Sequence, residues 1–333
     1  MKRNAYLDNA KVFLIFLVVF GHMIQPFASA DDKINTLYIW IYTFHMPAFI
    51  FLSGFFAKGS GDLNYIKKLA NQLLVPYLVF QALYTGFYFL IGKEGWNGVF
   101  YPQWSLWFLL SLFSWHLLLI VYKKFNPVVG ITLSLFIGVA VGYFNEIGHS
   151  FSLSRTFVFF PFFLLGYWIT ENQLSFVKKR SFKIFSTLML MGMALAIYTL
   201  PTIQTGWLLA SKSYADLGMP EFGGIMRLII YFIAIMMSVS VLAWIPERKN
   251  WLTVIGGKTL YVYLLHGFFI QYFREQKMFH LESTVDFIGL AFVSVAIVLF
   301  LATKEVSALW KPLIEGKRMT VSRQLNKQLF RET

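Results

Sequence analysis

Long apolar stretches alternate with short polar ones along the whole chain. Each long stretch approaches the ~20 residues that a helix needs to cross the hydrocarbon core of a membrane. There are ten of them, at about Asn9–Ala28, Ile34–Ala57, Leu73–Gly92, Ser105–Tyr122, Pro127–Phe144, Arg155–Ile169, Ser181–Pro201, Gly224–Ile245, Leu252–Tyr272 and Thr284–Thr303. The pattern therefore predicts an all-α, polytopic integral membrane protein with about ten transmembrane helices.

The first apolar stretch contains two ionisable residues, Lys11 and His22, eleven positions apart. At about 100° per residue their side chains are offset by only about 20°, so both lie on one face of the predicted helix. They are separated by roughly 16 Å along its axis. Ionisable groups inside a membrane span are energetically expensive and mark functional sites by default. The pair therefore predicts a functional site that runs along this face.

The composition excludes a soluble protein. The 333 residues are 57% hydrophobic, 19% aromatic and only 14% charged, whereas a soluble domain carries about a quarter charged residues. The chain contains no cysteine, which excludes a disulfide, a thiolate nucleophile and a cysteine metal site.

The basic residues set the predicted orientation. The net charge of +13 could indicate a nucleic-acid partner, but the lysines and arginines lie mostly in short loops between apolar stretches. With the N-terminus in the cytoplasm, 20 of these 29 residues fall in inside loops and tails. The outside loops hold Lys33, Lys93, Lys212, Arg274 and Lys277. Since cytoplasmic loops are enriched in basic residues, both termini are predicted to be cytoplasmic, with the lipid bilayer as a partner and no nucleic acid.

The predicted domain organisation has two parts. Residues 1–303 form a single transmembrane domain, and residues 304–333 form a basic cytoplasmic tail that anionic lipid headgroups would attract. An alternative reading concerns the N-terminus, because Met1–Arg3, an apolar core and Ala28–Ala30 resemble a cleavable secretory signal. Cleavage would remove Lys11 and His22, so the predicted site requires that this segment is retained.

Three histidines are predicted to share one depth in the membrane. Counted from the cytoplasmic ends of their helices, His22, His45 and His266 lie roughly 20, 18 and 21 Å deep. Each could instead only hydrogen-bond a neighbouring helix, without a catalytic role. Shared depth also leaves open whether the three helices touch.

Other polar and aromatic residues fall near the two membrane faces. Lys11 and Ser53 lie near the cytoplasmic face. Arg155 lies near the outer face, where it either binds a ligand or extends its charge to the headgroups. The stretch Trp104–Trp107 predicts an aromatic belt at the outer boundary or, alternatively, a stacking floor for a sugar.

Several motifs resemble those of one known family. They are Lys11-x10-His22 preceded by Leu7-Asp8, His45-Met46-Pro47-Ala48-Phe49, Lys67-Lys68-Leu69 with Val75-Pro76-Tyr77, Trp104–Phe108, Arg155 with Phe160–Gly166, and Tyr261–His266. Over essentially the whole chain they resemble the membrane acyltransferase-3 family, and most closely its sugar O-acetylases (fucose 4-O-acetylase-like members). Lys11 stands where many members have arginine, which keeps the point charge but loses bidentate contact with a phosphate.

The resemblance implies an enzyme that moves an acyl group, usually acetyl from cytoplasmic acetyl-CoA, to a hydroxyl of an extracytoplasmic or lipid-linked saccharide. It implies a multi-pass protein of the bacterial plasma membrane, a cell-envelope saccharide as acceptor, and no metal. His22 is the expected general base or acyl-accepting nucleophile. The catalytic candidates are His22, Lys11 and His45. The acyl-donor candidates are Lys11, Ser53, Lys67 and Lys68. The acceptor-binding candidates are Arg155, Trp107 and His266.

Two other functions stay open at this level. A transporter or flippase for a sugar or a lipid-linked saccharide also uses buried histidines, as proton relays, and would work without acetyl-CoA. An accessory membrane subunit would not need the polar residues at all. The outer loops do not identify a particular acceptor.

Overall fold

The computed structural model describes residues 4–58, 63–93, 98–148, 150–200 and 203–315, and all regular elements within them are helical. The first half of the chain forms α1 (Ala5–Ile24), η1 (Gln25–Phe27), α2 (Asp32–Tyr42), α3 (His45–Phe56), α4 (Leu63–Leu90), η2 (Trp104–Leu106), α5 (Trp107–Tyr122), α6 (Pro127–Ala140), η3 (Val141–Tyr143), η4 (Ser150–Ser152) and α7 (Leu153–Trp168). The second half forms α8 (Glu171–Phe176), α9 (Arg180–Thr199), α10 (Gly206–Leu209), α11 (Gly223–Trp244), η5 (Trp251–Gly257), α12 (Thr259–Glu275), α13 (Thr284–Leu301) and α14 (Lys304–Glu315).

The prediction of an all-α membrane protein is confirmed, because each of the ten apolar stretches coincides with helix. Seven segments of the described chain are long and apolar enough to cross a membrane as continuous or gently broken helices. An eighth qualifies only if η5 and α12 are counted as one span, and the helices at 127–143 and 153–168 are shorter. The count of ten crossings and the orientation of the termini therefore stay predictions.

The predicted span Leu252–Tyr272 is not one straight helix. It consists of η5 and α12, which are bent by 84° relative to each other. The bend follows from close packing of η5 on the start of α1: a Cβ at Gly256 would lie 2.6 Å from Cβ of Asp8. Only glycine allows the two backbones to approach this closely, so the chain must turn before α12 begins at Thr259.

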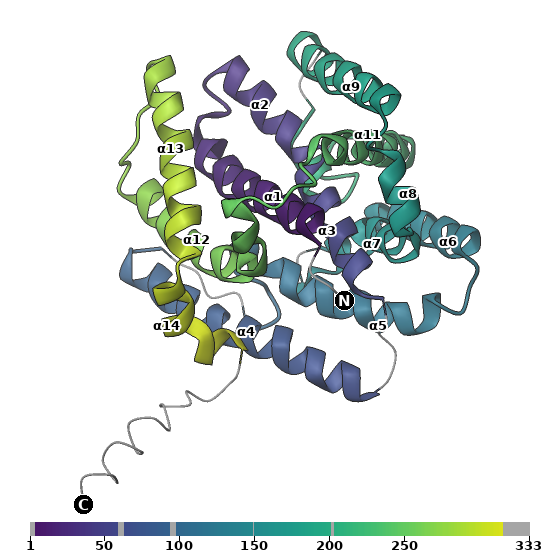
Figure 1. Ribbon diagram of the computed structural model, residues 1–333, viewed down its shortest axis with the longest axis horizontal. Coiled ribbons are helices and arrows are strands. Elements are labelled where there is room, and N and C mark those ends of the chain that lie inside the picture. Colours follow the sequence, from purple (N-terminus) through teal and green to yellow (C-terminus); the bar gives the residue numbers. More distant parts are fainter. Residues whose placement is uncertain (1–3, 59–62, 94–97, 149, 201–202, 316–333) are drawn as a thin grey trace, which may run out of the picture.

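Helix α1 lies in the middle of the bundle, with α3, α12 and α13 packed around it (Figure 1). Fifteen of its 20 residues are buried. Helix α9 is the opposite case, since Ser186 is its one buried residue, and it lies at the edge of the bundle against α11 and α2. A helix buried over most of its surface can hold polar residues in place, which makes α1 the natural support for a site.

Helices α3 and α7 cross at direct backbone contact. A Cβ at Gly54 would lie 1.9 Å from the carbonyl oxygen of Phe163, and a Cβ at Gly166 would lie 1.8 Å from that of Phe51. Small residues that let two helix backbones touch are the usual means of close packing in membranes. The two glycines thus fix α3, and with it the start of α3 at His45, against α7.

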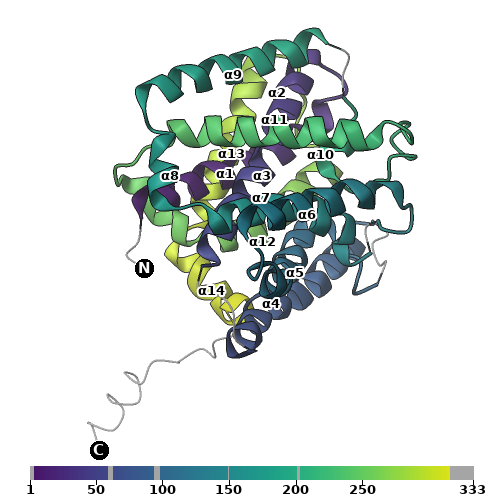
Figure 2. The same cartoon turned by 90° about the vertical axis from the view of Figure 1, so that its right-hand side faces the viewer.

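The bundle has two distinct ends, shown in Figure 2 with the N-terminus and α8 on one side and α10 toward the other. At the first, here called the N-terminal end, Lys178 donates to the carbonyl of Leu242 at 3.1 Å and lies 3.9 Å from the ring centroid of Tyr6. At the second, the opposite end, Nε of Arg155 donates to the carbonyl of Leu209 in α10 at 3.1 Å.

The predicted tail 304–333 begins as an ordered helix. Helix α14 packs beside α4, where the rings of Trp310 and Phe80 are 5.7 Å apart, and Glu315 accepts a hydrogen bond from Tyr261 at 2.7 Å. Residues 316–333 lie outside the described residues, and the domain boundary at 303 stays a prediction.

Candidate active site

The three histidines that were predicted to share a depth come together in space. The imidazole rings of His22 and His266 stack with centroids 5.7 Å apart. Nδ1 of His22 is 3.2 Å from the hydroxyl of Tyr42, and the ring of Tyr42 lies 4.5 Å from that of His45. The cluster therefore joins α1, the end of α2, the start of α3, and α12.

The helix that carries His266 does not run along the predicted path. Its depth was counted along a straight helix, whereas α12 starts after the 84° bend. Nδ1 of His266 lies 2.7 Å from the carbonyl of Tyr263 and 3.0 Å from that of Val262, so Nδ1 carries a proton, since carbonyls only accept. Nε2 is buried and has no hydrogen-bond partner among the described residues. In the neutral ring this nitrogen carries a lone pair, and the ring lies beside that of His22.

The indole ring of Trp104 packs against two of the histidines. Its ring centroid lies 4.5 Å from that of His22 and 5.2 Å from that of His266. Gly267 makes room for it, because a Cβ there would lie 2.4 Å from the indole. The backbone of Trp104 has φ +41°, a left-handed conformation that is rare for a bulky residue and is found at functional sites.

The segment before Trp104 turns back along α4 and is held by one side chain. The amide of Gln81, which is 2% exposed, donates to the carbonyls of Gly98 at 3.3 Å and Tyr101 at 2.8 Å. Its oxygen accepts from the backbone N–H of Gln103 at 2.9 Å. Three hydrogen bonds from a single buried amide thus fix the strained turn that carries Trp104.

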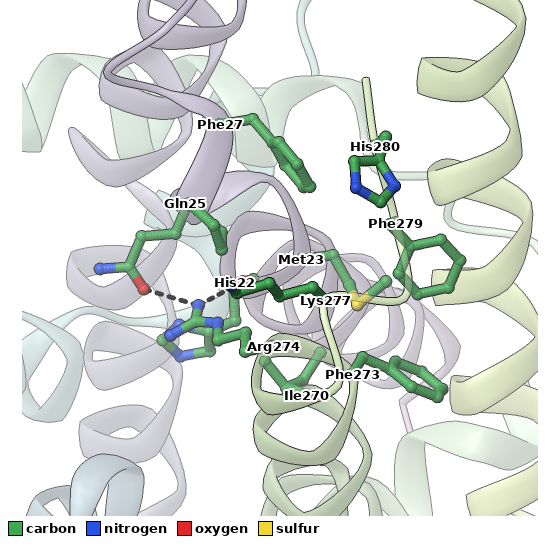
Figure 3. A pocket seen from close by; sticks show the side chains of 11 residues that line it. His22, Met23, Gln25, Phe27, Ile270, Phe273, Arg274, Lys277, Phe279 and His280 are labelled. Atoms are coloured by element: carbon green, nitrogen blue, oxygen red, sulfur yellow. Dashed lines mark hydrogen bonds between the residues drawn. The ribbon is translucent and has the colours of Figure 1, made fainter. Parts of the chain in front are cut away.

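Arg274 is a site residue that the sequence pattern placed in an outer loop. The predicted helix ended at Tyr272, but α12 continues to Glu275, and the added turn brings Arg274 to the end of α1. Its Nη2 donates to the carbonyl of His22 at 2.5 Å and to Oε1 of Gln25 at 2.8 Å (Figure 3). Extending the predicted helix beyond its last apolar residue could have found this position.

A cavity of about 560 Å³ opens beside His22 (Figure 3). Its walls come from the ends of α1 and α12 and from the chain that follows each, and they include the aromatic rings of Phe27, Phe273 and Phe279. Arg274 and Lys277 supply its charge. The volume lies within the range typical of small-molecule sites, which combine apolar walls with a few polar groups.

Lys11 forms an ion pair rather than standing alone. Its ammonium lies 2.7 Å from Oδ1 of Asp8, one helical turn earlier, and 4.8 Å from the ring centroid of Phe56. Asp8 is 4% exposed. The sequence pattern showed Asp8 beside Lys11 but not that the two pair, because the partner of a flexible lysine depends on the helices packed around it.

The face of α1 between Lys11 and His22 is closed. Ile15 and Val18, which lie on this face at helical spacing, are 0% and 5% exposed. Side chains that water can hardly reach leave almost no water-sized channel along the face.

The other predicted site residues take varied positions. Ser53 donates to the carbonyl of Phe49 in its own helix at 2.9 Å, so its hydroxyl is already engaged. Lys67 and Lys68 are exposed on α4. Trp107 stacks on Phe159.

Arg155 contacts Trp107 and α10. Its guanidinium is 5.0 Å from the ring centroid of Trp107, and its Nε donates to the carbonyl of Leu209 at 3.1 Å. The two acceptor-binding candidates Arg155 and Trp107 therefore form one unit, while His266 belongs to the cluster around His22.

Comparisons with known proteins identify the family of the chain. The family described as "Acyltransferase domain", acyltransferase-3, matches residues 4–303. The nodulation protein NolL of Sinorhizobium fredii (strain NBRC 101917 / NGR234) is 35% identical over 88 residues, which span 24% of this chain and 24% of that protein. No solved structure matches the chain. Since the family match covers nearly the whole chain, the resemblance predicted from the motifs is confirmed: the chain belongs to the acyltransferase-3 family and is a membrane acyltransferase.

Proposed function

We propose that the enzyme transfers an acetyl group from cytoplasmic acetyl-CoA to a hydroxyl of an extracytoplasmic or lipid-linked cell-envelope saccharide, in the bacterial plasma membrane. The observation that carries the proposal is the cavity of about 560 Å³ that has His22 among its lining residues. A cavity with aromatic walls suits the apolar face of a sugar ring, and a histidine in its lining suits proton transfer from a hydroxyl.

His22 acts as the general base in this proposal. The acceptor hydroxyl gives its proton to the imidazole as its oxygen attacks the thioester carbonyl. The new C–O bond forms, the C–S bond breaks, and the proton passes from His22 to the leaving sulfur of CoA. Tyr42, bonded to Nδ1 at 3.2 Å, keeps the ring in one orientation, and the packing of His45 against Tyr42 supports it. Transfer through an acyl-His22 intermediate uses the same geometry.

His266 and Arg155 keep acceptor-side roles. The lone pair on Nε2 of His266 can accept a hydrogen bond from a sugar hydroxyl beside His22. Nε of Arg155 is engaged with Leu209, so its terminal nitrogens would contact the acceptor or stabilise the oxyanion that forms on the thioester carbonyl. Trp107 supports the guanidinium by a cation–π contact.

The acyl donor is proposed to enter at the N-terminal end. Lys11, Lys67 and Lys68 would hold the phosphates of acetyl-CoA as point charges, with Ser53 nearby as a further donor-side candidate. The closed face between Lys11 and His22 adds a condition: the pantetheine arm passes only if α1 separates from its neighbours. Donor binding is therefore coupled to a movement of α1.

The role of Lys11 is tested by a pair of variants. Lys11→Met should lower the amount of folded protein, because it removes the ammonium that lies 2.7 Å from the buried carboxylate of Asp8. The double variant Asp8→Asn with Lys11→Met should restore the folded amount while KM for acetyl-CoA stays raised by about tenfold. Normal KM in the double variant would show that the lysine serves stability alone.

The proposed reaction is tested with the purified full chain in proteoliposomes. Acetyl-CoA labelled in the acetyl group is added, and saccharide fragments from a bacterial cell envelope are then examined for label. We expect label in saccharide ester groups that mild alkali releases. A transporter or flippase would move saccharide without any need for acetyl-CoA, and that result would sink the proposal.

A further inference from the structure

The cavity beside His22 has positively charged lining residues, and no acidic lining residue neutralises them. Two of its lining residues, Arg274 and Lys277, are cations, and none of the lining residues is an aspartate or glutamate. A neutral sugar is an array of hydroxyls that need hydrogen-bond acceptors as well as donors. Apart from the imidazoles and Gln25, the polar side chains of the lining are Arg274 and Lys277, which only donate, so the lining favours a ligand rich in acceptor atoms.

Of the two cations, Arg274 gives the stronger evidence for an anionic ligand. A guanidinium has five N–H groups, and Nη2 accounts for the two hydrogen bonds that Arg274 makes to side chains and backbone in the described part of the protein. Its Nε is buried without a partner. No carboxylate of the described residues lies within ion-pair distance of Arg274, and its guanidinium lies 5.9 Å from the ring centroid of Trp104. A cation in a membrane protein that lacks a counter-ion is costly unless a ligand supplies one.

Lys277 adds a second cation at an unusual backbone position. It follows the end of α12 with φ +47°, in the left-handed region that normally holds glycine or asparagine at a helix end. A non-glycine residue in this region is uncommon. The exposed lysine therefore extends the positive charge of Arg274 to the rim of the cavity.

We infer that the acceptor carries an anionic group, a carboxylate or a phosphate, close to the hydroxyl that is acylated. Arg274 and Lys277 bind that group while the sugar ring lies among Phe27, Phe273 and Phe279 and its hydroxyl meets His22. This inference rests on the proposed function, and it narrows the acceptor to acidic or phosphate-bearing saccharides.

A purely structural role for Arg274 is the competing explanation. A guanidinium bonded to the carbonyl of His22 caps the end of α1, where basic side chains are favourable. That role explains the bonds of Nη2 but not the unpaired Nε or the second cation at the rim. Lys277 makes no contact that caps α1 in the described residues, so it separates the two explanations.

The test measures binding without acetyl-CoA. Cell-envelope saccharide fragments are tagged with a fluorophore, separated by anion exchange into neutral and anionic pools, and titrated against the full chain in nanodiscs. We expect the anionic pool to bind at least about tenfold more tightly than the neutral pool. Chemical reduction of carboxyl groups in one sample and hydrofluoric acid dephosphorylation in another identify which anion is bound.

Variants then connect the binding to the cavity. Lys277→Gln should weaken binding of the anionic pool about tenfold, and Lys277→Arg should retain it. The control Lys212→Gln removes an exposed lysine elsewhere in the chain and should change nothing. Equal binding of both pools, no binding of either, or indifference to Lys277→Gln overturns the inference. Because no acyl donor is present, failure of the acetyl-transfer assay is a separate result and bears only on the proposed reaction.

Discussion

Replacement of His22 by glutamine is expected to lower kcat for acetyl transfer by a factor of about 100 to 10,000, the usual contribution of general acid–base catalysis. Glutamine keeps a side chain that can hydrogen-bond to Tyr42, which now lies 3.2 Å from Nδ1, but it cannot take up a proton. KM for acetyl-CoA should stay within a factor of about two, since the substitution removes an interaction of the transition state rather than of the bound donor.

The matched control is His116→Gln. His116 is also buried in a transmembrane helix, where it contacts Tyr65 and Phe163 rather than the cluster around His22. With both variants at wild-type protein level, the control should retain its activity. More than a tenth of wild-type kcat in His22→Gln would remove His22 from the catalytic role.

Alanine at Gly54 is expected to cause a large loss of stability for a change of a single methyl group. The new Cβ would lie 1.9 Å from the carbonyl oxygen of Phe163, so α3 and α7 must separate. Overpacking of this kind costs about 3 kcal/mol or more when backbone has to move. Because α3 begins at His45, the displacement should also disturb the histidine cluster, and activity should fall together with the thermal midpoint.

Gly192→Ala is the control for that prediction. Gly192 lies inside α9 with no atom within 4 Å of the position of its Cβ, and alanine is favoured over glycine in a helix by roughly 0.5–1 kcal/mol. The thermal midpoint of this variant should stay level or rise slightly, as followed by fluorescence-detected gel filtration of heated samples. Equal behaviour of the two variants would contradict the close crossing of α3 and α7.

The apolar pattern predicted the helices well, because a membrane requires about 20 apolar residues for each crossing and leaves few other solutions. It did not predict where helices break. The stretch Ile34–Ala57 is predominantly apolar and contains no glycine before Gly54, yet α2 ends at Tyr42 and α3 begins at His45. The bend before Thr259 depends on the contact between Gly256 and Asp8, which are far apart in sequence. Gly256-Gly257 was the available local signal.

The candidate site was predictable where it depends on spacing within one helix. Lys11 and His22 could be singled out because charge in an apolar helix is costly. The meeting of His22 with His266 could be anticipated as a shared depth, although the count for His266 assumed a straight helix. Trp104 and Arg274 could not be placed, since the first depends on the hydrogen bonds of Gln81 and the second on one added turn of α12.

The closed face of α1 also has a consequence for the cell. Ile15 and Val18 leave almost no water-sized space between Lys11 and His22, so at rest no file of water molecules follows this face toward the cavity. Protons move along such files, and in the plasma membrane that the proposed function requires, a continuous file would dissipate the proton gradient. The packed side chains block the passage of protons along this face. Any gap that forms beside α1 for the proposed acyl donor must therefore be brief and filled by the donor itself.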